Sequence, residues 1–250
     1  SKEEKHITAH RSPLPPDKEA AIFKLLAEDS GFRMRNKAEI EVLCYILKYT
    51  GQRQKDCVNL SWNRIDMNRR RISVTQEKTG KSVSIPIADE LYVMLKKAES
   101  WRENERVLPK TAERYAQKAP DGSEIGGNLV NKQILKLFER AGITTSIAVP
   151  GRKKKLTVYG VHSFRHSFAS HCAEAGIPRA VCASILGADA DIIDSYYVHI
   201  GEEAQEKAIR TLSTASPQTA EARISAALQL RSTIPDKTDL LLALEKILTQ

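Results

Sequence analysis

Apolar residues along this chain recur mainly three and four positions apart, the period of amphipathic helices packed against a core. This spacing predicts a series of helices over about residues 17–27, 37–49, 89–100, 129–141, 179–186 and 202–212. We expect Asp17 to cap the first of them, because an aspartate side chain accepts hydrogen bonds from a helix's first N–H groups. Gly51, Gly142 and Gly187 follow the last apolar residues of three helices, where glycine commonly ends a helix.

Strict alternation of polar and apolar residues, the period of a half-buried strand, appears at Arg71–Thr75 and again at Val83–Ile87. The intervening Glu77-Lys78-Thr79-Gly80-Lys81 contains a glycine, as hairpin tips commonly do. A polar stretch over residues 109–128, with Pro120 and several glycines, predicts a loop or a broken helix. The whole pattern therefore predicts a mainly α-helical protein with a small antiparallel β-sheet, an α+β fold.

The two ends of the chain differ from its middle. Residues 1–16 are polar and end in Ser12-Pro13-Leu14-Pro15-Pro16, which predicts an extended linker from an N-terminal domain that is missing upstream. Ser216-Pro217 interrupts the other end, and the last segment carries one apolar helical face made of Leu240, Leu241, Leu244 and Leu248. We therefore expect three parts: a linker over 1–16, one main domain over 17–212 and a helical tail over 213–250.

The balance of charges favours a polyanionic partner, since 39 Lys and Arg residues against 31 Asp and Glu give a net charge of +8. No apolar run approaches the ~20 residues needed to cross a membrane, and no signal peptide opens the chain. The four cysteines are scattered without a paired spacing, so we interpret them as reduced core thiols of an intracellular protein. We expect no metal site.

The most informative stretch begins at His162, where another helix is predicted. Phe164, Phe168 and Cys172 fall four residues apart and are expected to form one buried stripe. His162 and Arg165 share another side of the first turn, and an imidazole beside a guanidinium at a helix N-terminus can hold a phosphate oxygen. Taken alone, this pair is more typical of a capping histidine beside a solvated arginine.

Three further groups of charged residues allow the same two interpretations, as part of a functional site or as ordinary solvated surface. Arg53 follows the helix end at Gly51, and Asp56, three residues later, can orient its guanidinium, although an exposed loop arginine is the commoner case. Lys78 at the hairpin tip can reach into a groove or extend into water. A basic loop contains Arg152, Lys153, Lys154 and Lys155. It is either solvated surface or a site that binds the backbone of a polyanion.

Taken in order, these segments resemble the tyrosine recombinase (phage integrase) family over about residues 12–212, which is essentially the family's catalytic domain. Residues 50–56, Thr-Gly-Gln-Arg-Gln-Lys-Asp, are similar to its T-G-x-R-x-x-E motif, with Asp56 in place of glutamate. Residues 162–169 resemble its H-x-L-R-H-T-F-A box. Leu186-Gly187 begins the family's last box, which places a tyrosine at Tyr197 and a histidine at His199.

The resemblance implies a reaction on a DNA phosphodiester in which Arg53 and Arg165 hold the two non-bridging oxygens. It implies that Tyr197 attacks the phosphorus, and that His162 accepts the phenolic proton or holds an oxygen. Lys78, where the family has a hairpin lysine, would protonate the departing 5′-oxygen. Because arginines supply the electrostatic stabilisation, neither a metal nor another cofactor is implied.

The resemblance also implies residues in supporting roles. Those beside the reacting groups are Asp56, His166 and His199. Contacts to DNA are expected from Lys81 and from the basic loop at residues 152–155. Two rivals stay open: Tyr196 for the nucleophile, although spacing favours Tyr197, and Lys81 for the role of Lys78.

One position departs from the family pattern, since Ala188 stands where the family has histidine or sometimes tryptophan. In the family, this histidine or tryptophan donates a hydrogen bond to a non-bridging phosphate oxygen, and losing one such donor typically lowers the rate ~10²–10³-fold. Three explanations for Ala188 stay open: a tolerated natural change, a laboratory substitution, or a neighbouring residue that supplies the missing donor. We therefore expect a site-specific recombinase or integrase that forms a 3′-phosphotyrosyl intermediate. The alternatives are a catalytically impaired DNA-binding relative and a type IB topoisomerase-like enzyme.

The family resemblance implies partners as well. We expect double-stranded DNA carrying a recombination site, and a homotetramer on that DNA in which neighbouring subunits exchange C-terminal tails. No membrane partner is expected. The implied location is cytoplasmic and nucleoid-associated.

Overall fold

The computed structural model describes residues 12–27, 30–150, 155–188, 193–194 and 209. The chain divides into a first unit, Ser1–His199, and a second unit, Ile200–Gln250. All helices and strands named below belong to the first unit. The helix predicted over 202–212 and the tail over 213–250 lie outside the described residues apart from residue 209, and most of 189–199 lies outside them too.

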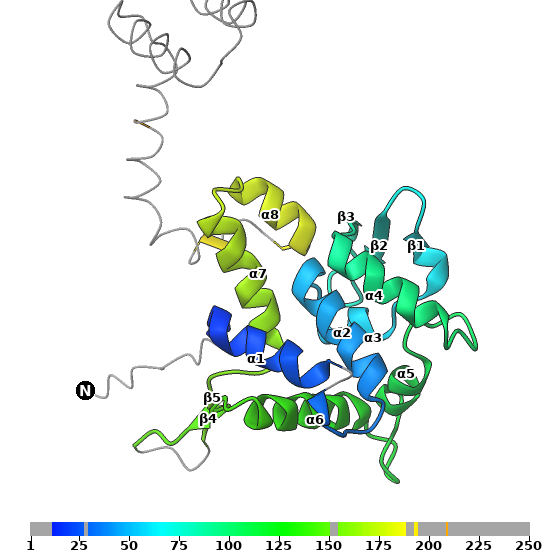
Figure 1. Cartoon of the computed structure of the whole chain (residues 1–250), viewed down its shortest axis with the longest axis vertical. Coiled ribbons are helices and arrows are strands. Elements are labelled where there is room, and N and C mark those ends of the chain that lie inside the picture. Colours follow the sequence, from blue (N-terminus) through cyan, green and yellow to red (C-terminus); the bar gives the residue numbers. More distant parts are fainter. Residues whose placement is uncertain (1–11, 28–29, 151–154, 189–192, 195–208, 210–250) are drawn as a thin grey trace, which may run out of the picture. The chain divides into compact units, whose positions relative to one another are not determined.

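Helices are the main secondary structure in the described part of the first unit, as the spacing of apolar residues predicts (Figure 1). Their bounds are α1 (Pro16–Leu26), α2 (Lys37–Thr50), α3 (Gln54–Val58), α4 (Asp89–Glu99), α5 (Pro109–Tyr115), α6 (Gly126–Arg140), α7 (His162–Glu174) and α8 (Arg179–Leu186). A 3-10 helix, η2 (Trp62–Arg64), follows α3. Helix α2 runs through the middle and contacts α1, α3, α4, α5 and α7.

A small antiparallel sheet completes the predicted α+β fold. It has the order β1-β2-β3, with β1 (Ile65–Asp66), β2 (Arg71–Thr75) and β3 (Ser82–Pro86). Ile72 pairs with Ile85, which places both apolar side chains on the buried face. A second sheet pairs β4 (Ser146–Ile147) with β5 (Leu156–Thr157). The sequence did not predict it, because two residues are too few to show alternation.

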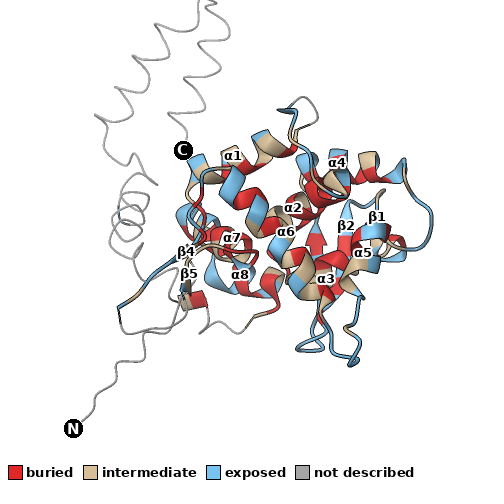
Figure 2. Ribbon diagram, turned by 90° about the horizontal axis from the view of Figure 1, so that it is seen from below, coloured by how far each residue is buried: buried red, intermediate tan, exposed pale blue. Residues whose placement is uncertain are grey.

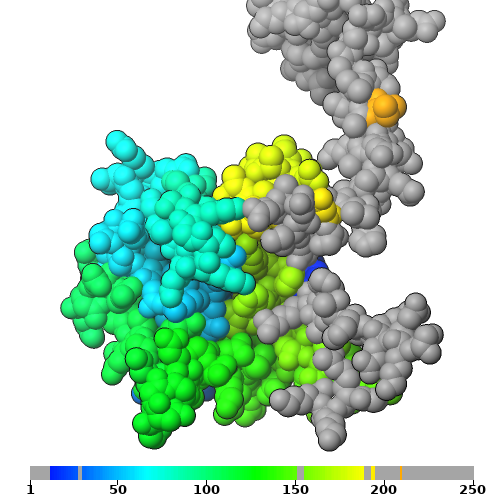
Figure 3. Space-filling model, turned by 180° about the vertical axis from the view of Figure 1, so that it is seen from behind, coloured from blue at the N-terminus to red at the C-terminus, as the bar shows by residue number. Residues whose placement is uncertain are grey.

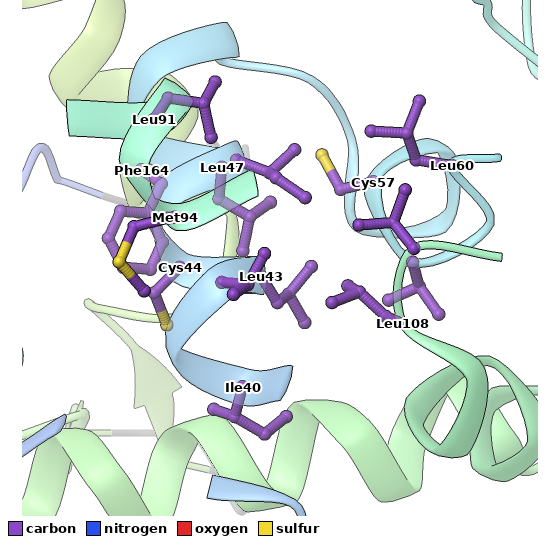
Figure 4. Close-up of a cluster of buried hydrophobic side chains, with 14 of the residues drawn as sticks. Ile40, Leu43, Cys44, Leu47, Cys57, Leu60, Leu91, Met94, Leu108 and Phe164 are labelled. Carbon is purple, nitrogen blue, oxygen red and sulfur yellow. The ribbon is translucent and has the colours of Figure 1, made fainter. Parts of the chain in front are cut away.

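The main hydrophobic core surrounds α2, which is buried on nearly every side. Ile40, Leu43, Cys44 and Leu47 project from it towards α4, α6 and α7 on one side and α3 on the other (Figure 4). Phe164 of α7 lies in this core with 1% of its surface exposed. Truncating such a phenylalanine to alanine typically costs about 3–5 kcal/mol, so α7 is firmly fixed at this point.

A second, smaller cluster joins α7 to α8. Its buried members are Ala169, Cys172, Cys182, Ala183, Leu186 and Ile193, and Phe168 packs against them. The predicted stripe along α7 is therefore confirmed, but it is divided between two clusters: Phe164 belongs to the main core and Cys172 to the smaller one. Figure 2 shows the same pattern, with buried residues on the inward faces of the helices.

One local prediction is wrong. Asp17 is not the cap of α1, which begins at Pro16, because proline suits the first helical position and places Asp17 inside the first turn. Of the two structures predicted for residues 109–128, the broken helix is the correct one: α5 occupies Pro109–Tyr115, and α6 begins at Gly126 rather than near 129.

The sequence left helix α5 undecided between loop and helix because its N-terminal cap comes from elsewhere in the chain. The carboxylate of Glu39 on α2 accepts hydrogen bonds from the backbone N–H groups of Lys110, at 3.1 Å, and Thr111, at 2.7 Å. These are two of the groups that a helix leaves unpaired at its start, so Glu39, which lies 71 and 72 residues before them in the chain, stabilises α5. A scan for local caps cannot detect such a contact.

Residues 12–15, just before α1, are extended, as expected, and they are bonded to other parts of the first unit. The Leu14 N–H donates to the Ser167 hydroxyl of α7 at 2.7 Å, and the Leu14 side chain is buried. The Ser12 N–H donates to the carbonyl of Val158. Within the described residues, no helix has the length and apolar character that a membrane span requires.

Candidate active site

Arg165, on the first turns of α7, is held by two backbone carbonyls. Its Nη1 donates to the oxygen of Gly51 at 2.9 Å, and its Nη2 donates to that of Leu186 at 3.0 Å. The side chain is half-buried, and this burial, followed by the nearby charge of Arg53, lowers its pKa to about 10. The guanidinium therefore stays charged at neutral pH but has lost part of its hydration, which strengthens its attraction for an anion.

Arg53 stands at the N-cap position of α3, and it is close enough to Arg165 for its charge to add to the lowering of the Arg165 pKa by burial. Its Nη1 donates to Oε1 of Gln76 at 2.7 Å. The turn that delivers it depends on Gly51, whose φ of 61° lies in the left-handed region. A Cβ there would also collide with Leu186 and Phe168, so glycine lets α2 end against α7 and α8.

The two arginines are linked by a chain of buried polar groups. Gln76, directly after β2, donates from Nε2 to the Leu186 carbonyl at 2.6 Å, the same oxygen that accepts from Arg165. Gln52, between Gly51 and Arg53, donates to the carbonyl of Ile185 at 2.7 Å. Helix α8 contacts β3, and Figure 3 shows yellow α8 beside the turquoise surface that contains this strand.

The hairpin between β2 and β3 carries both candidate lysines, Lys78 and Lys81, and both are exposed. Asp56 connects α3 to this hairpin, since its Oδ1 accepts from the backbone N–H of Glu77 at 3.1 Å. Lys55 Nζ lies 2.5 Å from a carboxylate oxygen of Glu77. This hydrogen bond joins Asp56 to the hairpin backbone. Burial and then the charge of Arg53 lower the pKa of Arg165, and the negative charge of Asp56 opposes part of that lowering.

His162 is the first residue of α7 and is exposed, whereas His166 is half-buried. The cap position belongs to Val161 and has no capping side chain. The interpretation of a capping histidine beside a solvated arginine is therefore wrong for both residues, because Arg165 is bonded to two carbonyls.

Ala188 follows the end of α8 and packs, half-buried, against the smaller cluster. Its backbone N–H donates to the carbonyl of Ala183 at 3.2 Å, and its methyl group offers no donor to an anion. Of the basic loop, Lys155 is described and exposed. Six other candidate residues lie outside the described part of the chain: Arg152, Lys153, Lys154, Tyr196, Tyr197 and His199.

Two residues of this arrangement, Gln52 and Gln76, were not predicted as functional. A signal for Gln76 was present, because it continues the alternation of Ile72 and Val74 and so falls on the buried face of β2. A polar residue at an inward position needs hydrogen-bond partners, which marks it for attention. For Gln52 the sequence carries no comparable signal.

Histidine, cysteine and carboxylate side chains do not gather into a possible metal site anywhere in the described residues. All four cysteines lie buried, and none is in a disulfide. What the described residues bring together is a pair of guanidiniums on fixed carbonyl acceptors, beside an exposed histidine and a lysine-bearing hairpin. Such a group of cations stabilises an oxyanion.

The chain belongs to the phage integrase family, whose model matches residues 14–204. This confirms the resemblance drawn from the sequence motifs. A protein named "Tyrosine recombinase XerC-like", from Caldanaerobacter subterraneus subsp. tengcongensis, is 24% identical over 192 residues. The match covers 66% of this chain and 46% of that relative, so the chain spans less than half the length of the relative.

Solved structures share the fold. The Tn1549 transposon integrase, in complex with transposon right end DNA, superposes with a TM-score of 0.61 at 16% identity, covering 83% of this chain and 68% of that one. The XerA recombinase gives a TM-score of 0.53 at 19% identity, covering 78% of this chain and 61% of that one. Identities this low show the fold, which is the mainly helical one with small antiparallel sheets that the sequence predicts.

Proposed function

We propose that this chain is the catalytic part of a site-specific DNA recombinase that cleaves and rejoins DNA through a 3′-phosphotyrosyl intermediate. The observation that carries the proposal is the convergence of Arg53 and Arg165 on one buried network. Two guanidiniums fixed by Gln76 and by the carbonyls of Gly51 and Leu186 need little reorganisation when charge develops on a phosphate.

The proposed steps follow from the chemistry of the groups. The arginine pair neutralises the non-bridging oxygens, and the Tyr197 hydroxyl attacks phosphorus while His162 accepts its proton or holds an oxygen. Lys78, exposed on the hairpin, protonates the departing 5′-oxygen. Reversal by a 5′-hydroxyl of another strand releases the tyrosine and rejoins the DNA. Asp56, His166 and His199 are assigned supporting roles.

The proposed partner is double-stranded DNA. The Tn1549 integrase was solved with transposon DNA, and a bound XerH and a bound lambda integrase are also similar in fold. The net charge of +8 supports the same partner. Lys81 and the basic loop at residues 152–155 would contact the backbone.

The proposed organisation goes beyond the family match. We assign residues 17–212 to the catalytic domain, 1–16 to a linker from an N-terminal DNA-binding domain, and 213–250 to a tail exchanged between subunits. The acting form would be a homotetramer on two DNA sites. Such a protein would reside in the cytoplasm with the nucleoid.

Covalent trapping tests this function. We would incubate the protein with a pool of nicked duplexes of randomised sequence, in which cleavage releases a short strand and so prevents religation. A denaturant-resistant protein–DNA adduct is expected, absent in Tyr197→Phe and retained in Tyr196→Phe. DNA binding without an adduct, in both the original chain and Ala188→His, would instead support a dormant DNA-binding relative.

A further inference from the structure

Gln76 uses every hydrogen-bonding position of its side chain. The residue has 0% of its surface exposed. Its Oε1 accepts from Arg53 Nη1 at 2.7 Å and from the Thr79 hydroxyl at 2.9 Å. Its Nε2 donates to Gln52 Oε1 at 2.7 Å and to the Leu186 carbonyl at 2.6 Å. An amide has two donors and two acceptor lone pairs, so the set is complete.

The partners leave the amide one orientation. A guanidinium donates only, so the atom that faces Arg53 must be the oxygen. A backbone carbonyl accepts only, so the atom that faces Leu186 must be the nitrogen. Gln52 is oriented in the same way, because its own Nε2 donates to the carbonyls of Thr50 and Ile185. A flip of either side-chain amide would place a donor against a donor and an acceptor against an acceptor.

The four bonds of Gln76 tie together parts of the chain that each carry a group of the proposed reaction. One reaches Arg53, and another reaches Thr79, which adjoins Lys78 on the hairpin. A third reaches the Leu186 carbonyl, where Arg165 also donates, at the end of α8 just before Ala188. A buried, fully bonded amide of this kind fixes geometry more tightly than an exposed one.

We propose that Gln76 is a positioning residue that aligns Arg53 and Arg165 with each other and with the lysine-bearing hairpin. This inference rests on the proposed function, which it deepens by assigning a task to a residue that touches no substrate. Cleavage depends on where the two guanidiniums stand relative to one phosphate, and a misplacement of about 1 Å can cost ~10²-fold in rate.

The same amide accounts for Gly187. This residue ends α8 with a φ of 58°, and a Cβ there would lie 2.5 Å from Nε2 and 2.7 Å from Cδ of Gln76. No side chain fits unless the amide moves. Gly187 and Gln76 therefore form one unit, in which the absence of a side chain at one position makes room for the amide at the other.

The test compares Gln76→Met, which keeps the length but loses all four bonds, with Gln133→Met as a matched control. Gln133 lies on α6, and its amide donates to the carbonyl of Arg35. Under saturating protein and a single turnover, Gln76→Met should form the covalent adduct ~10–100-fold more slowly. Its affinity for DNA should stay within about twofold, because exposed phosphate-binding cations are unchanged. Gln133→Met should match the original chain in both.

A second measurement does not depend on activity. ¹⁵N NMR of the guanidinium groups reports rotation about the Cζ–Nη bonds, which hydrogen bonds slow. Gln76→Met should speed this rotation for Arg53 and broaden or shift the Arg165 signal, whereas Gln133→Met should change neither. If thermal unfolding of Gln76→Met is not cooperative, the variant is not properly folded, and Thr79→Val on the exposed hairpin replaces it. Thr79→Val should form the adduct ~3–10-fold more slowly.

Unchanged Arg53 and Arg165 signals in the substituted protein would overturn the positioning role, as would an unchanged cleavage rate. If no variant, including the original chain, forms an adduct, the proposed function fails, and the NMR arm alone decides whether Gln76 positions the arginines. An equal loss of DNA affinity and of rate would also overturn the role, because it would indicate a general loss of structure.

Discussion

Two groups of cations in this protein differ in how they are held. Arg53 and Arg165 are fixed to carbonyl and amide oxygens inside the network around Gln76. A pocket of about 450 Å³ between residues 32–35 and α6 is lined by more cations, which are Arg33, Arg35, Arg114, Lys132, Lys136 and Arg140. Among the described residues, none of these six side chains forms an ion pair with a carboxylate.

The difference shows that the number of cations in a group and how firmly each cation is held are separate properties. Most of the pocket cations are exposed, so water and salt screen their charges within about 8 Å. The arginine pair presents fewer charges, but Arg165 is partly desolvated and has defined acceptors. Preorganised charge stabilises a transition state, whereas mobile surface charge mainly attracts a polyanion.

The largest effect is expected for Arg165→Lys. A lysine keeps the charge but cannot donate to the carbonyls of Gly51 and Leu186 while also offering a planar fork to phosphate. Adduct formation should fall by on the order of 10²–10³-fold in a single-turnover assay. The matched change in the pocket, Arg140→Lys, should leave the rate within about twofold. Equal losses in the two variants would abolish the distinction between the two groups.

The next largest effect is a gain, in Ala188→His. The position follows α8 and the Leu186 carbonyl that Arg165 uses, and alanine supplies no donor. An imidazole there adds a donor beside the arginine pair, so adduct formation should rise by ~10-fold or more. The same trapping assay measures it. A histidine that leaves the rate unchanged would indicate that another group already serves the phosphate oxygen.

The sequence singles out the two arginines, whereas it does not reveal the network that holds them. Arg53 and Arg165 lie in motifs with fixed local spacing, and the stripe of Phe164 and Cys172 follows from helix periodicity. Helix α5 stayed undecided between loop and helix because Glu39 caps it from a distant position. The alternation of β2 could have marked Gln76 as a buried polar residue, but its four partners lie in three segments that only the folded chain brings together.

Stability gives a smaller contrast, between Gly187→Ala and Gly176→Ala. Both glycines have positive φ, 58° and 69°, so each alanine carries a strain of ~1–2 kcal/mol. At Gly176 a Cβ meets nothing within 4 Å, whereas at Gly187 it meets the Gln76 amide. Gly187→Ala should therefore cost ~1–3 kcal/mol more.

Thermal unfolding measures that difference, at about 2–4 °C for each kcal/mol in a protein of this size. Gly187→Ala should also slow adduct formation, because the displaced amide releases Arg53, whereas Gly176→Ala should not. Equal melting temperatures for the two variants would mean that the Gln76 amide moves aside without cost, which conflicts with its four bonds.

The smallest effect on chemistry is expected in the pocket. Lys136→Gln combined with Arg140→Gln removes two exposed charges one turn apart on α6 and leaves the core face of that helix intact. The rate of adduct formation at saturating DNA should stay within about twofold, because neither side chain is tied to the arginine pair. Fluorescence anisotropy at several salt concentrations gives the second readout. If these residues contact phosphates, the slope of log affinity against log salt should become shallower by about 0.9 for each charge removed. If they only add to the electrostatic field around the protein, the slope should change by less than about 0.9 in total.

The rate of adduct formation is the decisive readout. A fall in this rate of more than about tenfold would contradict the contrast between the fixed arginine pair and the exposed cations of the pocket.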